Sequence, residues 1–177
     1  PMSLPNNTLQ KPKRRDHPMR RKNQQLPDEM CSSILKKAHT GTLALIDEDN
    51  FPYALPINYA FENNTFYFHC ALEGHKLQAI RHCNKASFCV IDKDEIVPEK
   101  FTTAYRSVIV FGEIQIIEEV STKRKALELL GRKYSPGLEQ SLQEEINRAF
   151  DRTCVIELKI EQMTGKQGIE LTRSKTN

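Results

Sequence analysis

The stretch FYFHCALEGHKLQAI, residues 66–80, carries the strongest structural signal in the chain. Its aromatic and β-type residues predict a strand, Gly74 marks a turn, and a short helix is predicted from His75 onward. The first N–H groups of a helix lack intrahelical partners, and the helix dipole favours negative charge there. His75 and Lys76 at such a start therefore indicate a phosphate or carboxylate site, the alternative being a solvated turn whose lysine points into water.

Short β-type segments on both sides of this stretch indicate a mainly β fold. Strands are predicted at residues 42–46, 53–61, 65–70, 86–91, 105–118 and 153–160. The first three follow one another through short turns, which predicts an antiparallel meander, whereas the polar segment 92–103 is predicted to be a long loop. Pro56 marks an edge or bulge, and Gly112 marks a bend in the longest strand.

Helical patterns occupy the intervals between these strands. One helix is predicted to begin after Pro27 and to end at Gly41, another starts near Ser121, and a third follows Pro136. Strands and helices do not alternate as in a doubly wound fold. About six antiparallel strands with helices at the ends therefore predict a small β-barrel with peripheral helices.

Charge is distributed unevenly along the 177 residues. The net charge is +3, but residues 1–22 contain seven basic residues and one acidic residue, a local +6, so the remainder sums to −3. Residues 1–18 have almost nothing to bury and are predicted to form a flexible basic arm. Because no nucleic-acid-binding module follows the arm, nucleic acid is not expected as a partner.

The five cysteines are scattered and odd in number, which suits reduced thiols in the cytoplasm. No apolar run is long enough for a membrane helix, no secretory signal is recognisable, and no membrane association is expected. Glycine-rich nucleotide motifs are absent from the sequence. His69 and Cys70 are adjacent on a strand and so face opposite sides, which argues against a metal site.

The residues offer an anion site without an obvious acid, base or nucleophile, as expected where a cofactor brings the reactive centre. In this context several motifs resemble, in the same order, those of the pyridoxamine 5′-phosphate oxidase-related flavoproteins, and most closely the nitroimidazole-resistance (Nim) proteins. These motifs are Met19-Arg20-Arg21-Lys22, Pro56-Ile57-Asn58-Tyr59, Phe68-His69-Cys70-Ala71, Glu73-Gly74-His75-Lys76, residues 97–103, residues 107–112 and Lys133-Tyr134-Ser135-Pro136. The similarity spans residues 19–166 and leaves residues 167–177 as a C-terminal tail.

The resemblance implies an FMN-binding split β-barrel that works as a homodimer with flavin at the subunit interface. It implies that Lys76, with His75, holds the FMN phosphate, and that Pro56, Ile57, Asn58 and Tyr59 run along the flavin ring with His69 and Cys70. Thr103, Tyr105 and Ser107 would complete the pocket, from the other subunit, and Arg21 could reach it. His69 would tune the flavin or donate a proton, with a plain packing role as the alternative.

Three functions are compatible with these residues. The first is an FMN-dependent oxidoreductase that takes electrons from a donor such as NAD(P)H and reduces a small oxidised compound, for example a nitroaromatic such as a 5-nitroimidazole. The second is oxidation of pyridoxamine 5′-phosphate, which asks for a second basic cluster that the sequence does not display outside the arm. The third is a flavin- or haem-binding protein without enzymatic activity, in which His69, His75 or His82 could be an axial ligand.

Overall fold

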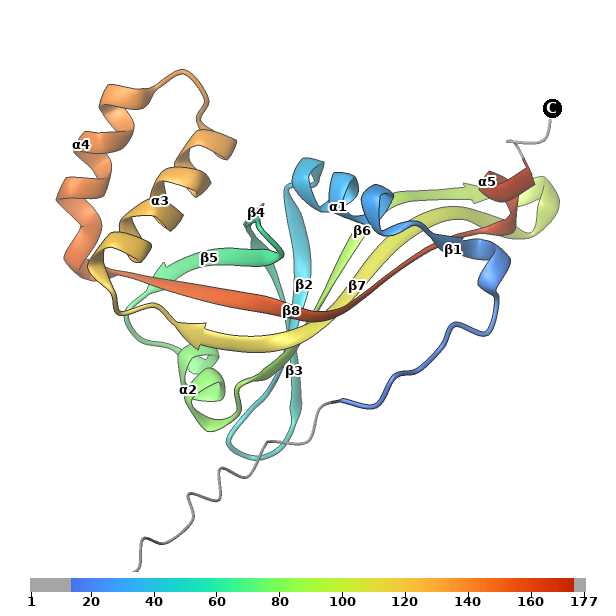
Figure 1. The fold of residues 1–177 in the computed structure, drawn as a ribbon, viewed down its shortest axis with the longest axis horizontal. Helices are drawn as coiled ribbons and strands as arrows, with labels where there is room; N and C mark the ends of the chain where they lie inside the picture. The colour runs from blue at the N-terminus through green and yellow to red at the C-terminus, as the bar shows by residue number, and fades with distance from the viewer. Residues whose placement is uncertain (1–13, 174–177) are drawn as a thin grey trace, which may run out of the picture.

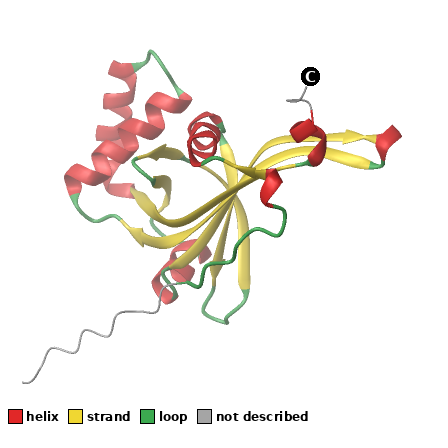
Figure 2. Cartoon of the chain, turned by 45° about the vertical axis from the view of Figure 1, so that its right-hand side comes forward, coloured by secondary structure: helices red, strands yellow, loops and turns green. Residues whose placement is uncertain are grey.

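A single curved antiparallel sheet organises the chain (Figures 1 and 2). The computed structural model describes residues 14–173, so most of the predicted N-terminal arm and the last four residues lie outside the described part. The strands are β1 (Gln25–Leu26), β2 (Thr40–Ile46), β3 (Pro52–Asn58), β4 (Ala60–Glu62), β5 (Thr65–Ala71), β6 (Lys85–Val97), β7 (Thr102–Ile116) and β8 (Thr153–Gln167).

The strands lie in the order β3-β2-β6-β7-β8-β5-β4, and β1 pairs with β8. The end strands β3 and β4 do not pair with each other in the described residues, so the barrel-like sheet is open. The mainly β fold with peripheral helices is confirmed. The expected number of about six strands was too low for two reasons. β1 has only two residues and is too short to produce a periodic pattern, and the predicted strand 53–61 combines β3 and β4, which Tyr59 alone separates.

The predicted meander of the first three strands is confirmed in its two hairpins and wrong in its continuity. β2 pairs with β3 and β4 pairs with β5, but the predicted second strand divides at Tyr59, and its two parts lie at opposite ends of the sheet. On its other side β5 pairs with β8, which follows it by more than eighty residues. The pattern of each strand was recognisable locally, whereas its partner is set by long-range packing.

The predicted loop at residues 92–103 is also wrong. β6 continues to Val97, a single turn of 3₁₀-helix, η2 (Pro98–Lys100), reverses the chain, and β7 starts at Thr102. Residues 92–106 therefore form a two-stranded hairpin arm that projects from the sheet at the right of Figure 1. The β6 half of the arm is mostly exposed and carries charged residues on both faces, which is why it resembled a loop in sequence, whereas the β7 half is partly buried and includes the buried Ala104.

Gly112 lies at a bulge, as predicted. The register of β7 and β8 shifts there, because Phe111 pairs with Gln162 and Gly112 with Ile160, which leaves Glu161 as the extra residue. A Cβ atom on Gly112 would lie 1.9 Å from the carbonyl oxygen of Lys159, so only glycine allows the two backbones to approach this closely.

The helices are α1 (Asp28–Lys37), α2 (His75–His82), α3 (Val120–Tyr134), α4 (Glu139–Ala149) and α5 (Ile169–Arg173), with further 3₁₀ turns η1 (Lys22–Gln24) and η3 (Phe150–Arg152). α1 follows Pro27 as predicted but ends before Gly41, which lies inside β2. A Cβ atom at Gly41 would lie 2.4 Å from the ring of Phe88, so this glycine serves strand packing and not helix termination.

The core lies between the inner face of the sheet and α1. Its centre is a group of fully buried rings, in which Phe66 and Phe88 have their centroids 4.9 Å apart and Tyr59 and Phe88 5.1 Å apart. Such edge and tilted contacts add to the free energy gained from burial alone. Among the described residues, no helix is long and apolar enough to cross a membrane.

Candidate functional site

The strand-turn-helix unit of residues 65–82 is the centre of the candidate site. β5 ends at Ala71, and Gly74 is the N-cap of α2 with a φ of 149°, in the region that favours glycine. No side chain caps the first turn of α2, so its N–H groups remain available to an anion. The predicted helix start at His75 is confirmed.

Lys76, in this first turn, is half-buried and makes no ion pair or hydrogen bond within residues 14–173. Its charge nevertheless acts on its neighbours, because it adds to the effect of burial that lowers the pKa of His69 and opposes the effect of burial that raises the pKa of Cys70. An ammonium group that is partly withdrawn from water and lacks a carboxylate partner is suited to pair with an incoming anion.

His75 has a different partner. Its Nε2 lies 3.3 Å from Oδ2 of Asp47, and its ring packs edge-on against Tyr53 with the centroids 4.5 Å apart. Asp47 accepts hydrogen bonds from the N–H groups of Phe51 and Asp49, which, together with His75, hold the pKa of its carboxyl group below the usual value. His75 therefore contacts the β2–β3 turn through Asp47. Of the two basic residues at the start of α2, Lys76 is the one without a partner in the described residues.

His69 and Cys70 face opposite sides of the sheet, as their adjacency predicted. His69 lies on the wall of a pocket of about 590 Å³ outside the sheet, whereas Cys70 packs against the core. Partial burial and the nearby Lys76 charge lower the pKa of His69, so the imidazole is neutral at pH 7. Burial raises the pKa of Cys70 to about 11, which makes this thiol a weak nucleophile at neutral pH.

The pocket beside His69 lies between β5 and the hairpin of α3 and α4, and it was not predicted from the sequence. Its wall is mainly apolar, with Leu127, Leu130, Leu138, Leu142 and Ile146 from the two helices. Polar side chains also line it, namely Asn58, His69, Tyr134, Ser135, Ser141, Glu145 and Thr153. This volume and this mixture of surfaces are typical of sites for small organic molecules.

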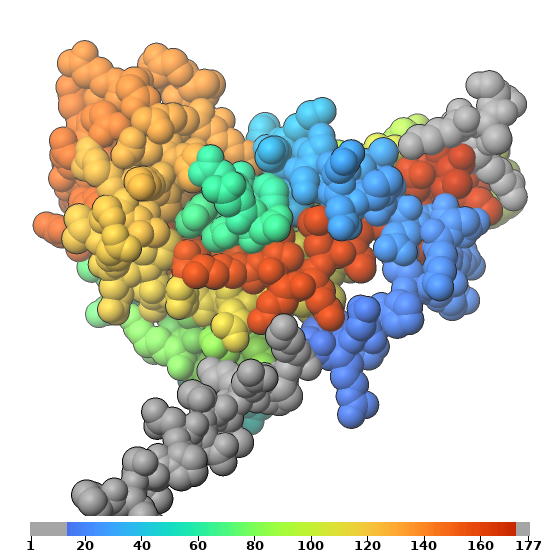
Figure 3. All heavy atoms as spheres, viewed as in Figure 1, coloured from blue at the N-terminus to red at the C-terminus, as the bar shows by residue number. Residues whose placement is uncertain are grey.

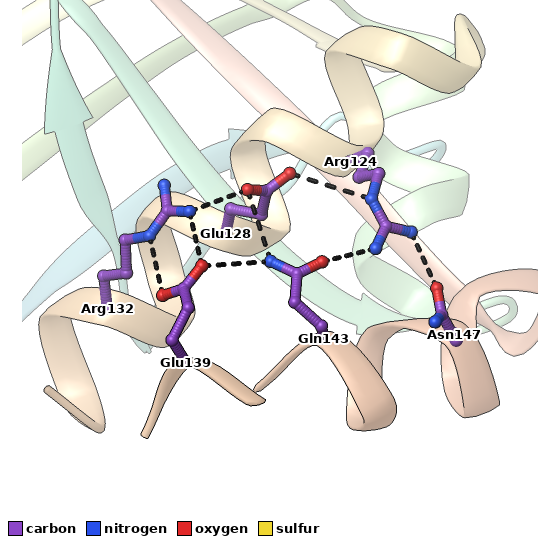
Figure 4. A network of polar contacts seen from close by, with 6 residues as sticks. All are labelled: Arg124, Glu128, Arg132, Glu139, Gln143 and Asn147. Atoms are coloured by element: carbon purple, nitrogen blue, oxygen red, sulfur yellow. Dashed lines mark hydrogen bonds and ion pairs between the residues drawn. The ribbon is translucent and has the colours of Figure 1, made fainter. Parts of the chain in front are cut away.

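A polar network on the other side of the two helices holds this hairpin together (Figure 4). Arg132 contacts Glu128 of its own helix at 2.8 Å and Glu139 of α4 at 2.7 Å. Arg124 donates to Asn147 at 2.9 Å further along the pair. The network fixes α4 on α3 and so keeps the pocket wall in place.

The segment from Pro56 to Tyr59 runs from the edge strand β3 into the core. Pro56 is exposed on the edge strand, as predicted, Ile57 packs on the core, and Asn58 lines the pocket. Tyr59 is fully buried and donates its hydroxyl hydrogen to the carbonyl of Leu35 at 2.6 Å. The backbone N–H and C=O of Tyr59 are bonded to side chains of α3, so Pro56, Ile57 and Asn58 form the accessible part of the segment.

Ser107 and Arg21 lie together in a second place. They line a groove of about 230 Å³ to which Arg20, Thr164 and Lys166 also contribute. Three cations beside two hydroxyl groups make this groove a second candidate anion site. Thr103 and Tyr105 lie farther along the arm, where the backbone C=O of Tyr105 accepts a hydrogen bond from Gly168. The contribution of Lys166 was not predicted, because it depends on the β7–β8 register.

The structure does not bring these two groups of residues together within one chain. His69 pairs with Val155 of β8, whereas Ser107 pairs with Lys166, eleven residues along the same strand. At about 3.3 Å per residue, the separation is of the order of 36 Å along the strand. Figure 3 shows α3 and α4 as a lobe at one end of the molecule and α5 at the other.

Metal ligation has no support in the described residues. Within residues 14–173, no group of three or more His, Cys, Asp or Glu side chains is arranged to hold a metal ion.

Comparison with known proteins agrees with the fold. A family model described as pyridoxamine 5′-phosphate oxidase matches residues 27–167, and no curated protein sequence matches the chain. Among solved structures, a candidate 5-nitroimidazole antibiotic resistance protein from Bacteroides thetaiotaomicron has 24% identity and a TM-score of 0.65, over 80% of this chain and 84% of that one.

Two mycobacterial structures share the fold at lower identity. A conserved hypothetical protein from Mycobacterium tuberculosis has 16% identity and a TM-score of 0.74, over 85% of this chain and 90% of its own. An FAD- and haem-binding protein from Mycobacterium smegmatis has 20% identity and a TM-score of 0.70, over 87% of this chain and 80% of its own. At these identities the likeness concerns the fold.

Proposed function

Because the chain belongs to the pyridoxamine 5′-phosphate oxidase family, we propose that it is an FMN-dependent oxidoreductase that reduces a small nitroaromatic compound such as a 5-nitroimidazole. The observation that carries the proposal is the strand-turn-helix unit of residues 65–82. It holds the unpaired Lys76 at the start of α2 and places His69 on the wall of an apolar pocket a few residues earlier.

The residues present fit a flavin phosphate. The first turn of α2 offers N–H donors, and Lys76 offers a charge that no described carboxylate neutralises. A terminal phosphate monoester, as in FMN, can approach both at once. The exposed edge of β3 at Pro56 and Asn58 would lie along the ring system.

A bound flavin supplies the electron-transfer chemistry. The apolar walls of the pocket would exclude water from a planar aromatic substrate. His69 would deliver a proton from its ring to the oxygen that gains negative charge when a nitro group is reduced. The similarity to the candidate 5-nitroimidazole resistance protein of Bacteroides supports this substrate class.

A homodimer would complete the site. Ser107, Arg21 and Lys166 form a second anion-binding group that one protomer holds far from Lys76. The arm also exposes Ile96 by 73% and Phe101 by 98%, an unusual amount of apolar surface for a projecting hairpin. If the arm packs on a second copy of the chain, it would bury this apolar surface. It would also bring Thr103, Tyr105 and Ser107 close to the flavin of the other subunit.

Oxidation of pyridoxamine 5′-phosphate is the second candidate. It requires a basic cluster for the substrate phosphate in addition to the one for the cofactor. The groove of Arg20, Arg21 and Lys166 meets that requirement, although the sequence alone showed no such cluster.

The visible spectrum of the purified protein tests the proposal. Two flavin bands are expected, with FMN released on denaturation, whereas a Soret band would indicate haem and a colourless protein that does not take up FMN would refute the proposal. Anaerobic NADH should then bleach the flavin, and a 5-nitroimidazole should restore its colour. Turnover of pyridoxamine 5′-phosphate in place of the nitro compound would favour the second candidate.

A further inference from the structure

Cys70 and Cys154 lie directly opposite each other on two neighbouring antiparallel strands. Cys70 of β5 pairs with Cys154 of β8 in a register that runs without interruption from Thr65 to Ala71. Both side chains belong to the inner face of the sheet, because both pack in the main core cluster. Each is a free thiol, and Cys154 is one of the neighbours that raise the pKa of Cys70, after the larger effect of burial.

This placement is close to that of a disulfide. Directly opposite residues of an antiparallel pair have Cα atoms about 4.5–5.5 Å apart and Cβ atoms at a similar distance. A disulfide requires a Cα separation of roughly 4.4–6.8 Å and a Cβ separation of about 3.5–4.5 Å. Facing positions therefore already meet the Cα requirement of a disulfide, and only a small decrease in the Cβ separation is needed to join the two sulfur atoms.

The three other cysteines lack such a partner. Cys31 is fully buried in α1, Cys83 follows α2, and Cys89 of β6 lies opposite Thr42 and Ile109. Among the five cysteines, only Cys70 and Cys154 face each other across two paired strands.

The two thiols differ in access. Cys154 is only 7% exposed, whereas Cys70 is half-buried near the end of β5. Lys76 lies close enough to Cys70 to favour its thiolate, against the effect of burial. Cys70 is therefore the sulfur that a reagent reaches first, and Cys154 is placed to resolve the product.

We propose that Cys70 and Cys154 are a redox-active dithiol that closes to a cross-strand disulfide when a small disulfide oxidant such as glutathione disulfide reaches Cys70. The Cys70 thiolate attacks one sulfur of the oxidant, and one glutathione thiolate leaves. The Cys154 thiolate then attacks the sulfur of Cys70 in the mixed disulfide, and the second glutathione thiolate leaves. The protein loses two electrons and two protons, and the oxidant becomes two glutathione thiols.

Closure would fasten the end of β5 to β8 immediately before the turn that leads to Lys76. It would also hold His69, the neighbour of Cys70, against the pocket wall. The inference depends on strand register alone and does not require a flavin.

The test is peptide mapping of the full chain after incubation with glutathione disulfide at pH 7, 8 and 9, with free thiols alkylated under denaturing conditions. We expect a peptide pair linked through Cys70 and Cys154, on a protein that stays monomeric in non-reducing electrophoresis under denaturing conditions. Because the pKa of Cys70 is about 11, the rate of closure should rise about tenfold per pH unit over this range. Full alkylation of both cysteines at pH 9, or a bridge between other cysteines, would overturn the proposal.

Three variants separate the two roles. Cys154→Ser should retain one glutathione on Cys70, because the resolving thiol is gone, and Cys70→Ser should retain none at Cys154. Cys89→Ser, which removes a half-buried thiol without an opposite cysteine, should close as the wild type does. Equal modification of Cys70 and Cys154 in the two single variants would contradict the assigned order of attack.

Discussion

The Nζ atom of Lys133 donates a hydrogen bond to the carbonyl oxygen of Tyr59 at 2.9 Å and lies 4.0 Å from the centroid of the Tyr59 ring. The same ammonium group donates to the carbonyl of Ala38 at 2.5 Å. The last turn of α3 is thereby fastened to the β3–β4 junction and to the end of α1. This attachment orients α3 over His69 and Asn58.

The neighbouring Tyr134 gives the first prediction. Its hydroxyl accepts the N–H of Tyr59 at 2.9 Å and lies 2.8 Å from the Tyr59 carbonyl. Tyr134→Phe leaves the buried N–H unpaired and should lower the free energy of unfolding by about 1–3 kcal/mol. Urea denaturation measures the loss. Tyr53→Phe is the matched control, because the Tyr53 hydroxyl makes no hydrogen bond in the described residues, and a similar loss there would contradict the assignment.

Removal of the Lys76 charge should weaken FMN binding. A charge-assisted hydrogen bond contributes about 1.5–3 kcal/mol, so Lys76→Ala should raise the dissociation constant of FMN roughly 10- to 100-fold. Fluorescence titration of the apoprotein gives the constant. Arg81→Ala is the control, because it removes an equal charge from the exposed end of the same helix. It should change the dissociation constant of FMN little. Unchanged affinity in Lys76→Ala would place the phosphate elsewhere.

His69 should act on the nitro compound and not on cofactor binding. His69→Gln should bind FMN and accept electrons from NADH as the wild type does, while reduction of a 5-nitroimidazole slows about 100-fold or more. The pKa of His69 is lowered below 6.5, so the protonated donor accumulates only as pH falls below that value. The rate of nitro reduction by the wild type should therefore rise as the pH falls, and the rate of the variant should not show this increase.

Stopped-flow absorbance separates the two half-reactions of this experiment. His82→Gln is the control, because His82 contacts Asn50 outside the pocket. A variant of His69 that reduces the nitro compound at the wild-type rate with the same pH profile would leave His69 a packing residue.

The hairpin arm should hold the dimer together. Ile96→Glu with Phe101→Ser places polar groups on the two most exposed apolar side chains of the arm. Analytical ultracentrifugation should show a monomer, with FMN affinity at least tenfold weaker. Val120→Glu, at an exposed valine of α3, should remain dimeric. A wild type that binds FMN tightly as a monomer would rule out the shared site.

The buried thiol of Cys31 should make stability fall at alkaline pH. Burial raises its pKa to about 11 from the ordinary value of 9, so between these values the unfolded chain releases the proton and the folded chain retains it. Stability is therefore lost as pH rises through this window, by up to about 2–3 kcal/mol. Under reducing conditions, the difference in unfolding free energy between wild type and Cys31→Ala should shrink by that amount from pH 8.5 to pH 11. A constant difference would mean that Cys31 ionises freely in the fold.

Local sequence patterns located most elements of the fold but not their partners. The strand ending at Ala71, the helix starting at His75 and the bulge at Gly112 follow from residue types within a few positions. The pairing of β5 with β8 does not, since any antiparallel strand of suitable polarity could occupy that place. The arm escaped prediction because its β6 half, residues 92–97, is mostly exposed and so has the composition of a loop.

The candidate site shows the same division. Lys76 and His69 stand out because motif and local geometry coincide at one short stretch. The pairing of His75 with Asp47 requires the β2–β3 turn to lie beside α2, and the groove of Arg21 and Lys166 requires two segments far apart in the chain. The pocket beside His69 depends on how α4 packs on α3, which no pattern within either helix specifies.

The extra residue Glu161 changes the parity of β8. Before it, the inward-facing positions are even-numbered, such as Cys154, Ile156 and Leu158; after it they are odd-numbered, such as Met163 and Gly165. The bulge absorbs this one residue, so deletion of Glu161 itself would join Ile160 to Gln162 in a regular ladder and leave Met163 and Gly165 facing inward. Deletion of a residue between Glu161 and Gly165 that the bulge did not absorb would instead turn Lys166 toward α1 and remove Gly165 from its contact with Cys31. The bulge is therefore the one place in β8 where the strand can gain or lose a single residue without reversing the faces of the residues that follow.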